Sequence, residues 1–446
     1  MNIRYTIGDC DRDEVNIKVE YSTNGSEFRT CSRLGDYGDS IDDLASSDPK
    51  NPAHYRFVWD SRKDLPGYSG KVSARLIPRD DIHVGKSAST GEFDLDNSVR
   101  RSRVVLAARN KDSSIGVLVL APDGTLSDTG IKVKLSDAPS KIVFSPDGMH
   151  ALVLHEQGGG HETVHSMLSI DHDMHVKLDY EWDAAGMYIV DAVFTPDGAR
   201  LYAADGNHES NGGGLHMFEC DDDGKLTPTD WFVSLHTPNA VAVHSTKSGL
   251  VLASGGITEQ DGFDLSLVDA RTKDVVGVDL NTGLSSPRIA LDSLRDIALI
   301  TDDGSYSGNK GAVASALLEP DGTGLDAAGF LTPVQSATDV HLVPGTTLAV
   351  ASNYFGDGVY VVDIGDKGEL TLVRTLKGIG LAGFMDVVDL GEGRSLALVP
   401  AISPKEGVGT LIARILFVQG GDTQLLEPFS IGTGVENMLS AIAIQP

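Results

Sequence analysis

The chain has 446 residues, of which 36 are lysine or arginine and 64 are aspartate or glutamate, and its formal net charge is -28 at pH 7. This charge argues against nucleic acid or an anionic membrane surface as a main partner, because both repel an acidic protein. The chain lacks an apolar run long enough to cross a membrane, so no membrane insertion is expected, and its 50 glycines and weak helical periodicity favour an all-β protein.

Residues 1–97 contain short strands of alternating polar and apolar residues, separated by turn-rich stretches. This pattern predicts a small β-sandwich of the immunoglobulin-like or fibronectin-like kind, followed by a linker at Asp94–Arg100. Cys10 and Cys31 are candidates for a disulfide, although a total of three cysteines excludes a disulfide framework. The clearest strands are Val15–Tyr21, Tyr55–Trp59 and Lys71–Ile77.

From Arg101 onward the chain repeats a pattern about every 50 residues, in which an apolar strand, a turn and a second apolar strand follow one another. The clearest copies begin with Lys141–Gly148 and Asp191–Gly198. A period of this length with four short strands is typical of a β-propeller blade. Weaker copies begin at Ala240, Arg288, Asp339 and Asp386.

The last copy, Ser440–Pro446, is only an opening strand, and the chain stops there. The first period lacks such a strand, because Arg103–Ala108 matches a second strand. The C-terminal strand is therefore expected to complete the first blade, which removes exposed sheet edges. Residues 98–446 are predicted to form a seven-bladed β-propeller closed in this way.

Several short motifs have structural explanations. Asp221–Lys225 resembles part of a calcium loop but lacks the later glutamate, so it is interpreted as a hairpin loop. His161–His165 has the spelling of a zinc-protease motif, which requires a helix. Here it runs into a strand, where its two histidines would lie about 13 Å apart, so a metalloprotease is rejected.

The Pro-Asp-Gly sequences at 121–124, 145–148, 195–198 and 319–322 are predicted to be type I turns.

Polar residues are expected to converge at one mouth of the propeller channel, where the first strands begin and the loops between second and third strands lie. Histidine and carboxylate side chains there suit Zn²⁺, carboxylate and amide oxygens suit Ca²⁺, and the same groups can act as acid and base. The alternative is that these are solvated loop residues without a site. The candidates for ligand binding or acid and base roles are His155, Glu156, Asp191, Asn239, Arg288, Asp339 and Asp386. The candidates for a divalent metal, Ca or Zn, are His155, His161, Asp205, His208 and Glu209.

The stretch Leu348–Ile364 resembles the repeat of the YVTN and lactonase-like seven-bladed propellers, in which a strand ends at an Asn-containing turn before a Val-x-Val-hydrophobic-Asp strand. Tyr202–Asn207 with Gly214–Phe218 is a looser copy, and the likeness covers about residues 101–446. It implies the fold, and it implies either a binding protein or an enzyme with an Arg, His and Glu cluster at the channel mouth. No such cluster is matched residue by residue. The N-terminal segment resembles bacterial immunoglobulin-like domains.

Two functions follow as hypotheses. The first is a binding propeller that holds a small polar ligand, a metal ion or a protein partner at the channel mouth. The alternative is a lactonase- or lyase-type enzyme that acts at the same face, with or without a metal. The sequence as written lacks an apolar secretory signal, which predicts a cytoplasmic protein, or a secreted one if the chain is a processed form.

Overall fold

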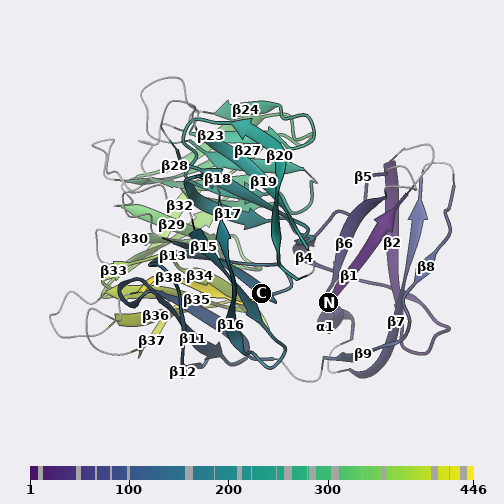
Figure 1. The fold of residues 1–446 in the computed structure, drawn as a ribbon, viewed down its shortest axis with the longest axis horizontal. Coiled ribbons are helices and arrows are strands. Elements are labelled where there is room, and N and C mark those ends of the chain that lie inside the picture. The colour runs from purple at the N-terminus through teal and green to yellow at the C-terminus, as the bar shows by residue number, and fades with distance from the viewer. Residues whose placement is uncertain are drawn as a thin grey trace. The chain divides into compact units, whose positions relative to one another are not determined.

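The computed structural model describes all residues except 9–13, 47–51, 66–67, 81–82, 98–100, 156–163, 185, 208–212, 222, 248, 256–263, 279, 281–287, 303–310, 333, 335, 354–357, 403–409, 421 and 432–438. Its regular structure is almost entirely β, with one short helix, α1 (Ser61–Asp64), and one 3-10 turn, Asn110–Asp112 (Figure 1). The chain divides into two compact units. Unit 1 is Met1–Arg101 with Ser245–Ser248, and unit 2 is Ser102–His244 with Gly249–Pro446.

Unit 1 contains two sheets that share one apolar core, whose members include Ile17, Phe57 and Trp59. The predicted small β-sandwich is confirmed, and the three strands predicted from sequence match β2, β6 and β7 to within two residues at each end. One sheet has the order β1 (Asn2–Ile7), β6 (Ala53–Trp59), β4 (Arg33–Gly38). The other has β3 (Arg29–Thr30), β2 (Glu14–Ser22), β7 (Ser69–Arg79) and β8 (Ala88–Ser89), with β5 (Leu44–Ala45) on β2 and β9 (Phe93–Asp96) on β7.

One detail of unit 1 differs from the sequence-based expectation. Strand β9 pairs with β7, so regular structure extends into the segment that was predicted to be a linker. Cys31 is a buried free thiol, and its suggested partner Cys10 lies outside the described residues.

The described strands of unit 2 form seven antiparallel sheets, six with four strands and one with five. The first sheet contains β38 (Leu439–Ile444), β10 (Arg103–Arg109), β11 (Ser114–Leu120) and β12 (Leu126–Lys134). The second contains β13 (Pro139–Phe144), β14 (His150–His155), β15 (Val164–Ile170) and β16 (Val176–Asp183). The third contains β17 (Ile189–Phe194), β18 (Arg200–Asp205), β19 (Gly214–Cys220) and β20 (Leu226–Ser234). The fourth contains β21 (Val241–Val243), β22 (Leu250–Ser254), β23 (Leu265–Asp269) and β24 (Val275–Val278).

The remaining three sheets complete the repeat. The fifth sheet contains β25 (Ile289–Asp292), β26 (Ile297–Asp302), β27 (Ala312–Leu318) and β28 (Leu325–Leu331). The sixth contains β29 (Ala337–Leu342), β30 (Leu348–Asn353), β31 (Val359–Ile364) and β32 (Leu370–Leu376). The seventh contains β33 (Leu381–Ala382), β34 (Asp386–Gly391), β35 (Arg394–Ile402), β36 (Thr410–Val418) and β37 (Asp422–Ser430).

The first strands of these sheets contact one another in a closed ring. In order, the ring contains β38, β13, β17, β21, β25, β29 and β34, and β34 contacts β38 again. The second strand of each sheet is buried on both faces, as in β26, where every residue is buried, whereas the outermost strand β12 is mostly exposed. This arrangement confirms the all-β propeller fold. Within the described part of the chain, no helix has the length and apolar character that crossing a membrane requires.

Closure of the ring by the C-terminal strand is confirmed. Strand β38 pairs antiparallel with β10, with Ala107 opposite Ile442. The side chain of Gln445 accepts a hydrogen bond from the Val104 N–H at 3.1 Å and donates one to the Gly148 carbonyl at 2.8 Å. The two ends of the propeller sequence are thus joined by a sheet, and the edge of β10 is covered.

The Pro-Asp-Gly turns have the predicted form. In the turn that ends at Gly148, the glycine has φ +72° and its N–H donates to the Ser145 carbonyl at 2.9 Å. The Asp147 carboxylate accepts from the Met149 N–H at 3.0 Å. Glycine is required here because this left-handed backbone conformation is strained for other residues. The short turn brings the first and second strands of a sheet into register.

The closing strand should carry a large share of the stability of unit 2. Ile442 is 3% exposed, whereas Ile131 on the outermost strand β12 is 45% exposed. Ile442→Ala should therefore lower the free energy of unfolding by about 2–5 kcal/mol through lost burial and a cavity. Ile131→Ala, the matched control, should lower it by less than about 1 kcal/mol. Urea unfolding followed by circular dichroism measures both, and equal losses would contradict the role given to β38.

Candidate functional site

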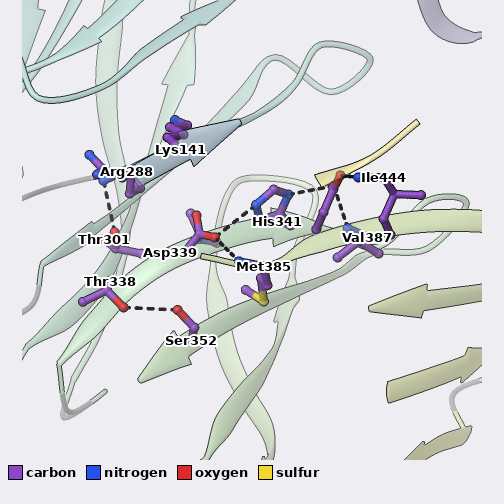
Figure 2. A network of polar contacts seen from close by, with 12 residues as sticks. Lys141, Arg288, Thr301, Thr338, Asp339, His341, Ser352, Met385, Val387 and Ile444 are labelled. Carbon is purple, nitrogen blue, oxygen red and sulfur yellow. Dashed lines mark hydrogen bonds and ion pairs between the residues drawn. The ribbon is translucent and has the colours of Figure 1, made fainter. Parts of the chain in front are cut away.

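Ionisable side chains gather on the first strands of the sheets. Figure 2 shows Asp339 and His341 of β29 together with Lys141 of β13 and Arg288, which directly precedes β25. We call the whole group the central cluster. It consists of Lys141, Asp191, Arg288, Asp339, His341 and Asp386.

Two aspartates of the cluster accept hydrogen bonds from two neighbouring first-strand segments. Asp339 accepts from the Val340 N–H at 3.0 Å and from the Met385 N–H, just before β34, at 2.9 Å. Asp386 accepts from the Val387 N–H and from the Ile444 N–H of β38, both at 2.7 Å. Each carboxylate therefore joins its own strand to the next member of the ring, and such charge-assisted bonds are stronger than neutral ones.

Asp191 has the same role on β17, with a lysine added. Its carboxylate accepts from the Ala192 N–H at 2.8 Å and from the Val241 N–H of β21 at 3.1 Å. It also forms an ion pair with Lys141 of β13. Asp191 is 2% exposed, so its charge is buried and fully engaged. It thus connects three consecutive first strands.

His341 lies between two of these carboxylates. It follows Asp339 by two residues on β29, and residues with this spacing share one face of a strand. Its Nε2 is 3.2 Å from Asp339 Oδ2 (Figure 2). Its Nδ1 is 3.7 Å from Asp386 Oδ1. The His341 side chain is 33% exposed, compared with 8% for Asp339. It is therefore the member of this trio that is most open to a ligand.

The protonation states of Asp339, His341 and Asp386, the trio, depend on one another. Burial lowers the pKa of His341, but the carboxylates of Asp339 and Asp386 outweigh burial, and the pKa is raised above its ordinary value. Burial raises the pKa of Asp339, yet the adjacent imidazolium overcomes it and the pKa is lowered. The pKa of Asp386 is raised, by burial and by the charge of Asp339. Asp339 therefore stabilises the protonated form of His341, and His341 stabilises the Asp339 carboxylate.

Lys141 acts on this trio from another part of the ring. Its positive charge lowers the pKa values of both Asp339 and His341. Strands β13 and β29 are not neighbours in the ring, since β17, β21 and β25 separate them on one side and β34 and β38 on the other. Lys141 therefore acts on Asp339 and His341 from a strand that does not adjoin β29 in the ring.

Arg288 is held at this centre by contacts that leave part of its guanidinium available. Nη1 donates to the Asn239 carbonyl at 2.8 Å, and the guanidinium carbon lies 4.7 Å from the centre of the Phe384 ring. Its buried Nε has no hydrogen-bond partner within the described part of the chain. No carboxylate among the described residues forms an ion pair with Arg288. Among the described residues, Arg288 is thus a cation that is held in place without a carboxylate counter-ion.

The other sequence candidates lie elsewhere or are differently engaged. His155, the last residue of β14, is 4% exposed, and its Nε2 is 3.1 Å from Oγ of Ser166 on β15. Burial lowers the pKa of His155. Asp205 accepts from the backbone N–H groups of Tyr188 at 2.9 Å and Asn207 at 3.0 Å. Asn239 contributes its carbonyl to Arg288. Glu156, His161, His208 and Glu209 lie outside the described residues.

Two of the five metal candidates, His155 and Asp205, have described positions. No group of three or more His, Cys, Asp or Glu side chains in the described ranges is arranged to hold an ion. His155 and Asp205, the two metal candidates with described positions, are engaged with Ser166 and with backbone N–H groups. The carboxylates of the central cluster accept backbone hydrogen bonds, which reduces their capacity as ligands.

Sequence reasoning selected Asp339, Asp386 and Arg288 but did not select His341 or Phe384. The signal for His341 was present, because it follows Asp339 at the two-residue spacing of a strand face. The signal for Phe384 was absent, because its contact with Arg288 joins residues that are far apart in sequence.

The comparisons with known proteins identify a fold. Neither a family model nor a curated protein sequence matches the chain. It is similar to the solved structure of a periplasmic gluconolactonase from Pseudomonas aeruginosa, with 16% identity, a TM-score of 0.59 and coverage of 78% of this chain and 99% of that one. A putative 6-phosphogluconolactonase from Bacteroides fragilis gives 17% identity, a TM-score of 0.58 and coverage of 77% and 98%.

A third similar structure has a different description. It is a hypothetical selenium-binding protein from Sulfolobus tokodaii, with 12% identity, a TM-score of 0.54 and coverage of 77% of this chain and 93% of that one. At such low identities the similarity establishes the propeller fold. Function has to be argued from the site.

The raised pKa of His341 predicts a pH-dependent contribution to stability. The folded state holds the proton more tightly than the unfolded chain, so the contribution is fully present below the unfolded pKa of about 6.5 and is lost as pH rises through the folded pKa. His341→Gln should therefore destabilise the protein more at pH 5.5 than at pH 9, as measured by urea unfolding. His172→Gln, at an exposed position, is the control. A His341→Gln effect that does not change with pH would contradict the assignment.

Proposed function

We propose that unit 2 is a seven-bladed propeller of the lactonase-like class, that unit 1 is an immunoglobulin-like or fibronectin-like module, and that the central cluster binds a small polar molecule with a negative charge. The observation that carries the binding proposal is the state of Arg288. Its guanidinium is fixed by a carbonyl and an aromatic ring, and it has no carboxylate partner among the described residues. A bound carboxylate or phosphate would supply that partner.

The charges of the cluster support an anionic ligand. The charge of Lys141 is matched by Asp191, and that of protonated His341 by Asp339. The Asp386 carboxylate lies near His341, with Oδ1 3.7 Å from Nδ1. Arg288 is the cation of the cluster that no described carboxylate pairs with. Guanidinium groups bind carboxylates and phosphates through two parallel N–H bonds, which gives both affinity and orientation.

A second candidate function is hydrolysis of a lactone. His341 is partly exposed and is oriented by Asp339, which is the arrangement of a general base with its positioning carboxylate. In the fraction that is neutral, His341 would take a proton from water as the water oxygen attacks the lactone carbonyl carbon. The ring C–O bond then breaks, and the imidazolium returns the proton to the alkoxide. One similar structure is named a periplasmic gluconolactonase and another a putative 6-phosphogluconolactonase, which supports testing this substrate class.

A divalent metal is a separate proposal that the described residues do not support. It would be held by His155, His161, Asp205, His208 and Glu209, three of which lie outside the described ranges. Elemental analysis of the native protein and of a His155→Ala/His208→Ala variant decides the question. Stoichiometric Ca or Zn that is lost in the variant would support the metal site, and no stoichiometric metal in either form would remove it.

Ligand binding is expected to depend on Arg288. Gluconate, the open-chain acid of the suggested lactone class, is the probe, and isothermal titration calorimetry gives its dissociation constant. Arg288→Gln should weaken binding roughly 10- to 100-fold, the effect of losing hydrogen bonds to a charged group. Arg29→Gln, an exposed arginine of unit 1, should change it less than about twofold. Equal affinity of wild type and Arg288→Gln would contradict this role.

Catalysis, if it occurs, should depend on His341. The measurement is the hydrolysis rate of glucono-1,5-lactone above its spontaneous rate. His341→Gln should lower kcat roughly 10²- to 10⁴-fold, the usual contribution of an acid or base group, whereas His172→Gln should not. Gluconate binding without any acceleration by the wild type would leave the binding function and remove the lactonase function.

A further inference from the structure

Unit 1 contains a cavity that is separate from the central cluster. Its volume is about 320 Å³, and it lies between the two sheets of the sandwich. It is lined by the end of β1, the start of β2, the end of β7, and β8. Strands β1 and β8 are each at the edge of their sheet in the described pairing order. The cavity is thus located where the edges of the two sheets leave the core partly open.

The inner wall of the cavity is apolar. Ile7, Val15, Ile17 and Leu76 line it, and each is between 4% and 7% exposed as a member of the unit 1 core. An apolar group that enters the cavity would therefore meet aliphatic side chains and leave water, which is favourable in proportion to the buried area. This wall selects for a hydrocarbon portion in the ligand.

The outer part of the lining carries one arginine and one lysine side chain, neither of which has a counter-ion among the described residues. Arg79 and Lys86 are exposed, and neither forms an ion pair or side-chain hydrogen bond within the described residues. The one carboxylate in the lining, Asp80, accepts a hydrogen bond from the His83 N–H and lies 3.7 Å from the His83 imidazole. Among the described residues of a chain with net charge -28, Arg79 and Lys86 thus form a basic pair at the cavity.

We propose that this cavity binds a small amphipathic carboxylate. The apolar tail would lie against Ile7, Ile17 and Leu76, and the carboxylate would bind Arg79 and Lys86. At about 30 Å³ for each water-sized group, the volume holds about ten non-hydrogen atoms. Octanoate has this number of atoms and this distribution of charge. The proposal is independent of the function proposed for the central cluster.

Titration calorimetry of the full chain with sodium octanoate tests the proposal. We expect one site per chain, with affinity at least tenfold weaker in an Arg79→Gln/Lys86→Gln variant. The control variant, Arg29→Gln/Lys63→Gln, removes the same charges from exposed positions of unit 1 outside the cavity and should bind as the wild type does. Octan-1-ol, which has the same tail without the charge, should bind more weakly than octanoate, and acetate should not bind detectably.

Two further variants make the test decisive. Arg288→Gln should leave octanoate binding unchanged, which separates this site from the central cluster. Ala88→Phe, at an exposed position of the cavity lining, should weaken octanoate binding by filling space. The proposal is overturned if octanoate does not bind, if both double variants lose affinity equally, or if affinity is lost with Arg288→Gln instead. Circular dichroism of each variant verifies that the fold is retained.

Discussion

The ring of first strands depends on carboxylates that each accept backbone N–H groups from two consecutive strands. Asp191, Asp339 and Asp386 share this geometry, and the last of them binds the strand that closes the propeller. Within a ring, each such bond fixes the position of a sheet relative to its neighbour in addition to satisfying a buried donor. Removing one carboxylate would leave two N–H groups without their acceptor, and each buried unsatisfied group costs about 1–3 kcal/mol.

The same constraint creates the candidate site. Three buried or partly buried carboxylates around one centre require positive charge nearby, because burying unpaired charges is costly. Lys141 and His341 supply it through direct pairs, and the proximity of carboxylates raises the pKa of His341. Arg288 is different, because its guanidinium is supported by Asn239 and Phe384, and no carboxylate among the described residues pairs with it. This state of Arg288 is the basis of the proposed binding function.

Much of the fold was predictable because it follows from local sequence patterns. Six apolar openings at a regular period, the Pro-Asp-Gly turns and the half-repeat after Ser440 each correspond to a described strand or turn. The site was predictable only in part. Asp339, Asp386 and Arg288 follow from their positions at the start of first strands, whereas the stacking of Arg288 on Phe384 depends on the closed ring. His155 was predicted to be a ligand in a loop, but it is the last residue of β14 and is buried against β15. A shift of one residue in the strand boundary decides whether such a side chain lies in the strand or in the loop.

The proposed binding function requires an anion bound at Arg288 to change the proton affinity of His341, a partly exposed group of the same cluster. NMR titration of the protein with ¹³C-labelled histidine measures this directly, with the His341 signal assigned from the His341→Gln spectrum. We expect His341 to titrate above the ordinary histidine value of about 6.5, and we expect gluconate, as an anion, to raise this pKa further. A His341 pKa at or below the ordinary value that gluconate leaves unchanged would contradict the proposed site.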